Sequence, residues 1–348
     1  VNFKNLEATK RTEVLSDNAQ WFEDNSPVDA RFKKKECKGV TAKVITTAIL
    51  AGDCYPATPI GINLPNANWI RETYGSKSVT IENITYAYDQ AAKGNGFKEE
   101  FVDCDADREM IEKYGYITDN IHPDLHECLG HGSGQLLPGV SQDALKAYGA
   151  TVEEARADLF GLYYSADPKM VELGLLPTED AYKAEYYTYL MNGLMTQLVR
   201  INLGDQIEEA HMRNRALIAH WVYEKGAADK VVELEKRDGK TYVRINDYKK
   251  LRTLFGDLLA EIQRIKSEGD FEAARKLVEN YGVNIDPELH KEVKERYAKL
   301  NISPYKGFIN PTYQLVEKDG KVVDVKVDYK EGYAEQMLRY SKMNNNVE

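Results

Sequence analysis

The sequence predicts a mainly α-helical protein with small β elements. Long segments carry apolar residues at helical spacing and contain few helix breakers, whereas only two short segments alternate in the manner of strands. One stretch rich in proline and glycine separates these patterns. Of the 348 residues, 43% are hydrophobic and 29% are charged, which is the usual balance of a globular protein with a buried core.

The helical segments follow one another along most of the chain. Residues 2–24 show helical spacing, and Ser26-Pro27 resembles a helix cap followed by a first-turn proline. The stretch 178–201 is long, apolar and aromatic, which predicts a buried helix. The remaining predicted helices are 205–226, which is amphipathic and ends at Gly226, and 247–267, 270–281 and 286–300.

Two β-hairpins are predicted where Asp-Gly pairs stand between alternating apolar residues. Asp238-Gly239 and Asp319-Gly320 mark their turns. The segment 54–69 holds three prolines and a glycine, and it predicts an extended loop or an edge strand.

Charge and composition exclude several classes of protein. Lys and Arg number 46 against 56 Asp and Glu, and the net charge of −10 argues against a nucleic-acid binder. No run of about 18 apolar residues predicts a membrane span. The four cysteines show no zinc-binding spacing, so we expect reduced thiols. The chain starts at Val1, which suggests that its beginning has been removed, and we expect a cytoplasmic location.

The segment His122–Leu136 reads HPDLHECLGHGSGQL and holds a candidate metal site. His126 and His131 are five residues apart, with Glu127 beside the first. On a regular helix this spacing turns the second side chain by about 140°, so both cannot face one metal. A one-residue π-bulge corrects the angle, and Gly130 and Gly132 tolerate an altered backbone. The spacing therefore predicts a locally widened helix.

A second acidic segment lies downstream, at the predicted start of a helix over 151–164. Glu153 and Glu154 lie in its first turn, and Asp158 follows one turn after Glu154. A carboxylate from a separate helix completes a site of two histidines and one glutamate, and it leaves one position open for water. Further carboxylates suit the hydrogen bonds that orient ligand imidazoles.

HECLGHGSGQL and EEARAD together resemble the two signature motifs of the dipeptidyl peptidase III family of zinc exopeptidases, whose first motif carries the extra residue. GINLPNANWIRETYG and EEAHMRNRALI extend the resemblance along the chain. The resemblance implies one Zn²⁺ per chain. The implied metal and catalytic residues are His126, His131 and Glu154 as ligands, Glu127 as base, and Glu153 and Asp158 as carboxylates that hold the histidines.

The resemblance also implies an oligopeptide substrate and release of its N-terminal dipeptide. Asn63 and Asn66 match asparagines that hold the substrate's N-terminal end. His211 matches a histidine that stabilises the transition state, and Arg215 lies on the same helix along the cleft. Lys306 matches a basic residue near the far end of the peptide.

The chain departs from the family pattern in its extent, because it matches the C-terminal half. We expect a helical zinc lobe over 1–60 and 94–304, and parts of a mixed α/β lobe over 61–93 and 305–348. As a fragment it is expected to be a poor peptidase and to self-associate through an exposed face. Two alternatives remain open at this point: a zinc- or peptide-binding module without catalysis, and a domain that never binds zinc.

Three other histidines are assigned no chemical role. His122 is interpreted as structural and His220 as a core residue, whereas His290 is expected to be exposed to solvent.

Overall fold

The structure is a computed structural model that describes residues 1–37, 42–50, 60–64, 70, 77–302 and 309–344. The fold is mainly α with small β elements, as the sequence predicts. Among the described residues, no helix is both long enough and apolar enough to cross a membrane.

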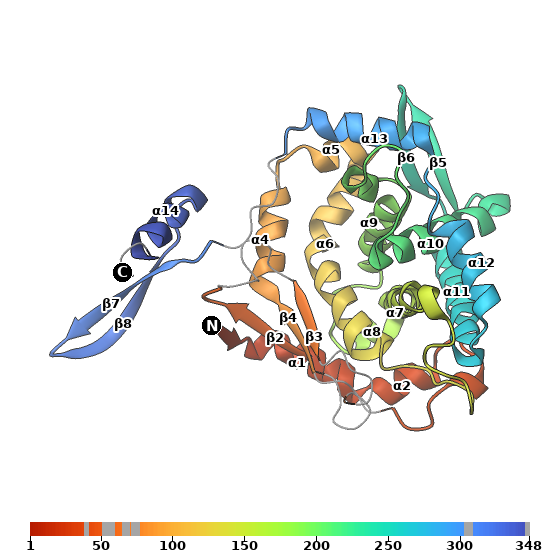
Figure 1. Cartoon of the computed structure of the whole chain (residues 1–348), viewed down its shortest axis with the longest axis horizontal. Coiled ribbons are helices and arrows are strands. Elements are labelled where there is room, and N and C mark those ends of the chain that lie inside the picture. Colours follow the sequence, from red (N-terminus) through yellow and green to blue (C-terminus); the bar gives the residue numbers. More distant parts are fainter. Residues whose placement is uncertain (38–41, 51–59, 65–69, 71–76, 303–308, 345–348) are drawn as a thin grey trace.

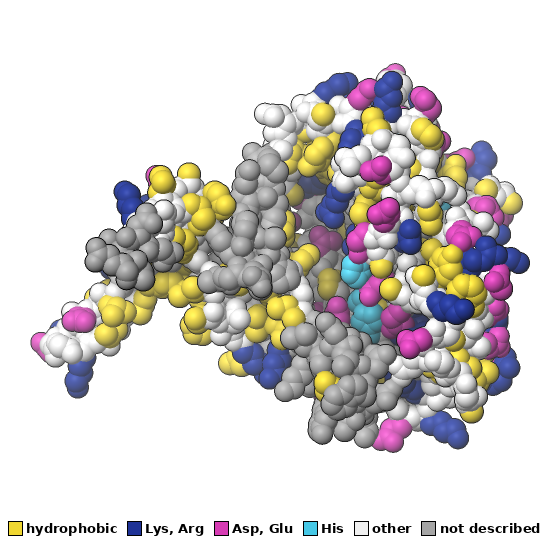
Figure 2. All heavy atoms as spheres, in the orientation of Figure 1, with side chains coloured by type: hydrophobic (Ala, Val, Ile, Leu, Met, Phe, Trp, Pro, Cys, Tyr) yellow, Lys and Arg dark blue, Asp and Glu magenta, His cyan; other side chains and the backbone are white. Residues whose placement is uncertain are grey.

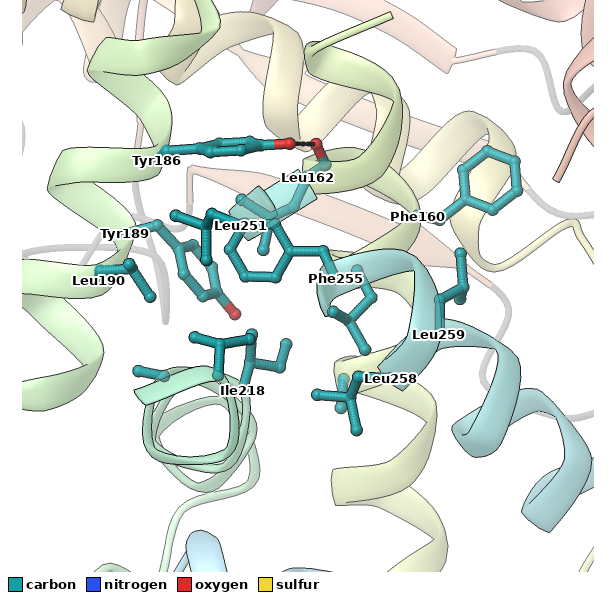
Figure 3. Close-up of a cluster of buried hydrophobic side chains, with 14 of the residues drawn as sticks. Phe160, Leu162, Tyr186, Tyr189, Leu190, Ile218, Leu251, Phe255, Leu258 and Leu259 are labelled. Carbon is teal, nitrogen blue, oxygen red and sulfur yellow. Dashed lines mark hydrogen bonds between the residues drawn. The ribbon is translucent and has the colours of Figure 1, made fainter. Parts of the chain in front are cut away.

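Helix α7 (Gly149–Ser165) lies at the centre of the helical body and contacts α6, α9, α10 and α11 (Figure 1). Twelve of its seventeen residues are buried, because its sequence is apolar on nearly every face. The side chains labelled in Figure 3 come from α7, α9, α10 and α11 and point toward one another. The neighbours of α7 are α6 (Asp105–Leu125), α9 (Tyr182–Leu194), α10 (Ala210–Lys225) and α11 (Tyr248–Glu268).

Shorter helices surround this body. The α-helices are α1 (Leu6–Asp17), α2 (Ala19–Asp24), α4 (Glu82–Ala92), α5 (Phe97–Phe101), α8 (Pro168–Glu172), α12 (Phe271–Tyr281), α13 (Pro287–Lys299) and α14 (Tyr333–Asn344). Short 3₁₀ turns cover Ala30–Phe32, Lys146–Tyr148, Thr196–Arg200 and Ala227–Asp229.

A four-stranded sheet with the order β1-β2-β4-β3 lies beside α1 and α4. Only the β2–β4 pair is parallel, and β3 is an edge strand, in keeping with the edge segment predicted around it. Its strands are β1 (Asn2–Lys4), β2 (Ala42–Thr47), β3 (Gly61–Leu64) and β4 (Lys77–Ile81). The sheet joins strands from the ranges 1–60 and 61–93, whose assignment to separate lobes stays a prediction.

Both predicted hairpins are present. One pairs β5 (Val232–Arg237) with β6 (Lys240–Ile245), and the other pairs β7 (Thr312–Lys318) with β8 (Lys321–Asp328). In each turn the aspartate and the glycine both have positive φ, as a two-residue turn of this handedness requires.

Two predicted helices are interrupted. The segment 2–24 begins as β1, and α1 starts only after Asn5, whose side chain accepts hydrogen bonds from the N–H groups of Glu7 and Ala8. The segment 178–201 breaks at Met195, where φ is −139°, and continues as a 3₁₀ turn. Pairing of β1 with β2 therefore prevails over the local helical pattern in the first case.

The C-terminal unit, formed by β7, β8 and α14, stands away from the helical body (Figure 1). The Asn310 side chain bonds to both backbone groups of Leu50, at 2.8 and 2.9 Å, and the Tyr313 hydroxyl donates to the Ala48 carbonyl at 2.8 Å. Apolar side chains on this unit remain exposed, among them Leu315, Val323, Val325 and Val327.

Candidate metal centre

Helix α6 ends in a π-helical turn over His126–Gly130. The N–H of His131 donates to the carbonyl of His126 at 3.0 Å, which is a bond across five residues rather than four. The predicted widening is thus confirmed. Pro123 lies just before it and has no N–H, so the regular ladder is already interrupted one turn earlier. The extra residue brings the two imidazoles together, with ring centroids 4.6 Å apart.

Gly130 serves this turn in a way that the sequence did not indicate. Neither Gly130 nor Gly132 has a positive φ, so unusual backbone freedom is not the reason for either glycine. A Cβ at position 130 would lie 2.8 Å from the Cα of Ala157 and 2.9 Å from its carbonyl oxygen. The π turn can therefore rest directly on α7, which carries the acidic residues of the site.

Three side-chain atoms from these two elements converge. The Oε2 of Glu154 lies 3.2 Å from the Nε2 of His126 and 3.9 Å from the Nε2 of His131. Ligand atoms of these three residues all lie within 4.8 Å of one another. The Glu154 oxygen is buried and accepts no hydrogen bond from the described residues. Two imidazole nitrogens and one carboxylate oxygen form a donor set that suits zinc, so the residues present fit this ion.

The other nitrogen of each histidine is held by a carboxylate. His126 Nδ1 donates to Asp158 Oδ1 at 2.7 Å, and His131 Nδ1 donates to Glu153 Oε1 at 2.8 Å. Because Nδ1 carries the proton in each ring, the lone pair of Nε2 is directed to the centre of the group. The structure thus brings Glu153 and Asp158 to the positions that the sequence predicts for them.

The charge of Glu154 follows from its neighbours. Burial raises the pKa of this carboxyl group, but contacts with the imidazoles of His126 and His211 outweigh it and lower the pKa to about 2. Glu154 is therefore ionised at neutral pH and is available to a cation. It lies in the second turn of α7, not in the first as predicted, because the helix begins at Gly149.

Glu127 and His211 both lie at this group. Glu127 is the one residue of the π turn that is not buried. His211 lies at the N-terminal end of α10, and its Nδ1 is 3.4 Å from Glu154 Oε2. This contact raises the pKa of His211. Arg215 follows one turn later and is partly buried. Figure 2 shows histidine and acidic side chains together on the wall of a hollow in the molecule.

The predicted substrate residues are described only in part. Asn63 lies in the edge strand β3, where its backbone pairs with Ser78. Its side chain, and the whole of Asn66 and Lys306, lie outside the described residues, so their roles stay predictions.

Residues behind the two carboxylates were not predicted by sequence reasoning. Those behind Glu153 are Arg156 and Lys266, and those behind Asp158 are His122, Tyr189, Asn214 and, through His122, Glu185. Two signals were available: Arg156 lies within EEARAD, and His122 precedes His126 by one helical turn.

One histidine prediction is wrong. His290 is 2% exposed, because its Nε2 contacts the backbone carbonyls of Leu198 and Ile201 at 3.0 and 3.1 Å. His220 is partly buried beside the carbonyl of Tyr281, in keeping with its predicted place in the core.

A helical fold in which two histidines and a glutamate converge, with a second glutamate beside the first histidine, has the form of a mononuclear metallopeptidase site. A model of peptidase family M49 matches residues 1–146 and 139–338. The chain belongs to this family of metallopeptidases.

Named relatives agree with this assignment. Dipeptidyl peptidase 3 of Dictyostelium discoideum is 25% identical over 333 residues, which cover 81% of this chain and 45% of that protein. Nudix hydrolase 3 of Arabidopsis thaliana is 26% identical over 324 residues, covering 91% of this chain but only 38% of that protein. The chain thus spans less than half the length of these relatives. DPP III from Caldithrix abyssi has a similar fold, with a TM-score of 0.70 at 24% identity, over 86% of this chain and 54% of that one.

Proposed function

We propose that this chain carries the zinc-dependent hydrolytic site of a dipeptidyl peptidase, which releases N-terminal dipeptides from oligopeptides. The observation that carries the proposal is the convergence of His126 Nε2, His131 Nε2 and Glu154 Oε2 in a member of family M49. These three residues are the proposed ligands of one zinc ion. Zinc bound there acts as a Lewis acid and makes water acidic near neutral pH.

The chain's own residues supply the proton transfers and part of the charge stabilisation. Glu127 follows a proposed ligand and is not buried, so it can take a proton from the attacking water and pass it to the leaving amine. His211 is a donor beside Glu154, at the place where negative charge develops on the carbonyl oxygen. Arg215, one turn further on the same helix, is a proposed contact for the peptide.

The peptide is proposed to lie in the hollow that Figure 2 shows beside these histidines. Asn63 and Asn66 are the proposed partners of its free α-amino group, and Lys306 the partner of its far end. Counting two residues from an anchored amine to the scissile bond gives dipeptide release.

The first test is metal content together with hydrolysis of a dipeptidyl-naphthylamide. Purified wild-type chain should hold one zinc, and His131→Ala should lose it, because one of three ligands is removed. Glu127→Ala should keep the zinc and lose about 10²–10⁴-fold in turnover, since only proton transfer is affected. Zinc content that is unchanged by His131→Ala contradicts the ligand assignment.

A zinc- or peptide-binding module without catalysis is the alternative. It predicts one bound zinc with no hydrolysis, in the wild type as in Glu127→Ala. Because a displacement of about 1 Å in the reacting groups can cost about 10²-fold in rate, a weak but Glu127-dependent rate supports the peptidase assignment.

We further propose that the C-terminal unit binds a second copy of this chain. Tyr313 faces Val327 and Leu315 faces Val325 across the hairpin, so one face carries an exposed apolar row. A two-stranded hairpin is marginally stable in water unless this face is covered. Light scattering should show dimers that Leu315→Lys abolishes and that Lys326→Ser, on the opposite face, leaves intact. Monomers at every concentration of the wild type contradict this proposal.

The cytoplasmic location remains a prediction of the sequence, and cell fractionation with an antibody to this chain tests it.

A further inference from the structure

The carboxylate of Asp158 accepts four contacts from hydrogen-bond donors. Oδ1 lies 2.7 Å from His126 Nδ1 and 3.1 Å from His122 Nε2. Oδ2 accepts from the Tyr189 hydroxyl at 2.7 Å and from the Asn214 amide at 3.0 Å. A carboxylate offers roughly four lone-pair positions, so every one is used. The carboxylate therefore has one orientation in which all four donors are satisfied.

Among these donors, only His122 is itself held by another carboxylate. Its Nδ1 lies 2.9 Å from Glu185 Oε1, so the imidazole bridges Asp158 on α7 and Glu185 on α9. The side chain of Glu185 is 6% exposed and that of Asp158 is 9% exposed. Burial lowers the pKa of His122, but the charges of both carboxylates outweigh this and raise the pKa to about 10. The imidazole is thus a cation between two anions.

The chain leaves a place for this ring. A Cβ at Gly161 would lie 3.1 Å from His122 Nδ1 and 3.2 Å from its Cε1. Gly161 follows Asp158 by one turn of α7, so the missing side chain and the carboxylate lie on the same face of the helix. The ring can therefore pack against α7 beside the oxygen that it contacts.

His122, His126 and Asp158 also lie close enough together to suggest a second metal site. The geometry argues against that reading. The two nitrogens of His122 face different carboxylates on different helices, and His126 Nδ1 is 2.7 Å from Asp158, which is a hydrogen-bond distance. A metal at this place would displace these contacts.

We propose that His122 and Glu185 are positioning residues for the metal centre: together they fix the carboxylate of Asp158 and, through it, the imidazole of His126. This inference rests on the proposed zinc function. Neither residue contacts the group formed by His126 Nε2, His131 Nε2 and Glu154. Their effect is to hold one ligand in the orientation that binding requires.

The test measures zinc affinity by competition with a chromophoric chelator, and ligand geometry by the visible absorption of the Co²⁺-substituted protein. His122→Gln should weaken zinc binding by roughly 10-fold, within the usual range for residues behind a ligand, and should change the Co²⁺ spectrum. Glu185→Gln should change both in the same direction by a smaller factor. The double variant should resemble His122→Gln alone, because Glu185 acts through His122.

His220→Gln is the matched control, since His220 is a partly buried histidine away from the site, and it should match the wild type. If His122→Gln does not fold, Glu185→Gln and Gly161→Ala, which crowds the His122 ring, carry the test. An unchanged affinity and Co²⁺ spectrum overturn the inference, as does a loss of thermal stability of the metal-free protein alone. Additive effects of the two variants, or two zinc ions per chain, also overturn it. A wild-type chain that binds no zinc instead removes the proposed function, and this inference with it.

Discussion

The two histidine–carboxylate pairs of the candidate metal centre perform the same task with different chemistry. Glu153, which holds His131, is backed by two cations, Arg156 and Lys266. Asp158, which holds His126, is backed by a tyrosine, an asparagine and a histidine that is already paired with Glu185. The Glu153 side chain is 25% exposed, whereas that of Asp158 is 9% exposed.

This difference in exposure explains the choice of partners. Where water reaches the carboxylate, ion pairs supply its partners at little cost. Where it does not, each unpaired oxygen would cost about 1–3 kcal/mol or more, so saturation by fixed donors is required. The pair that holds His126 should therefore be the more sensitive of the two to small changes.

Gly130→Ala should have the largest effect, because it separates both pairs at once. The added Cβ would lie 2.8 Å from Ala157, so the π turn must move away from α7. Overpacking of this kind costs about 1–3 kcal/mol of unfolding free energy, and we expect zinc occupancy to be lost. Gly149→Ala is the control, since its Cβ would meet only Leu145 at 3.8 Å. Denaturant unfolding and metal analysis measure both; normal occupancy in Gly130→Ala contradicts the close-approach argument.

Asp158→Asn and Glu153→Gln compare the two pairs directly. In Asp158→Asn the new amide must direct its N–H groups at one of four donors, so zinc affinity should fall by about 100-fold, the upper end of the usual range. In Glu153→Gln the cations and water can readjust, and a loss of about 10-fold is expected. Chelator competition gives both values. Equal losses would show that exposure does not distinguish the pairs.

Lys266→Met removes one of the two cations behind Glu153. Arg156 still contacts this carboxylate at 2.7 and 3.0 Å, so the loss in zinc affinity should be only a few-fold, near the lower limit for such residues. Lys266→Arg keeps the charge and should behave as the wild type. A loss as large as that of Glu153→Gln would assign the holding of Glu153 to Lys266 alone.

Tyr189→Phe should have the smallest effect on the metal. It removes one donor to Asp158 Oδ2, while Asn214 still donates to the same oxygen. We expect a loss of about 0.5–1.5 kcal/mol in unfolding free energy, the usual worth of one hydrogen bond, and little change in zinc affinity. A large drop in affinity would mean that the Asp158 network is less redundant than its four donors suggest.

The sequence by itself determined the features that depend on neighbours along the chain. The five-residue spacing of His126 and His131 predicted the π turn, because the angle between side chains on a helix depends on spacing alone. The Asp-Gly pairs predicted both hairpin turns through the conformations that these residues favour.

Only the tertiary structure decided what lies behind and beneath these features. Gly130 is required by Ala157, which is 27 positions away, and Asp158 is saturated by donors from α6, α9 and α10. His290 is buried because two carbonyls more than 80 residues away need a partner. Spacing along one helix gives the face that a residue occupies but not the partner that packs against it. Burial and the saturation of a charge depend on that partner.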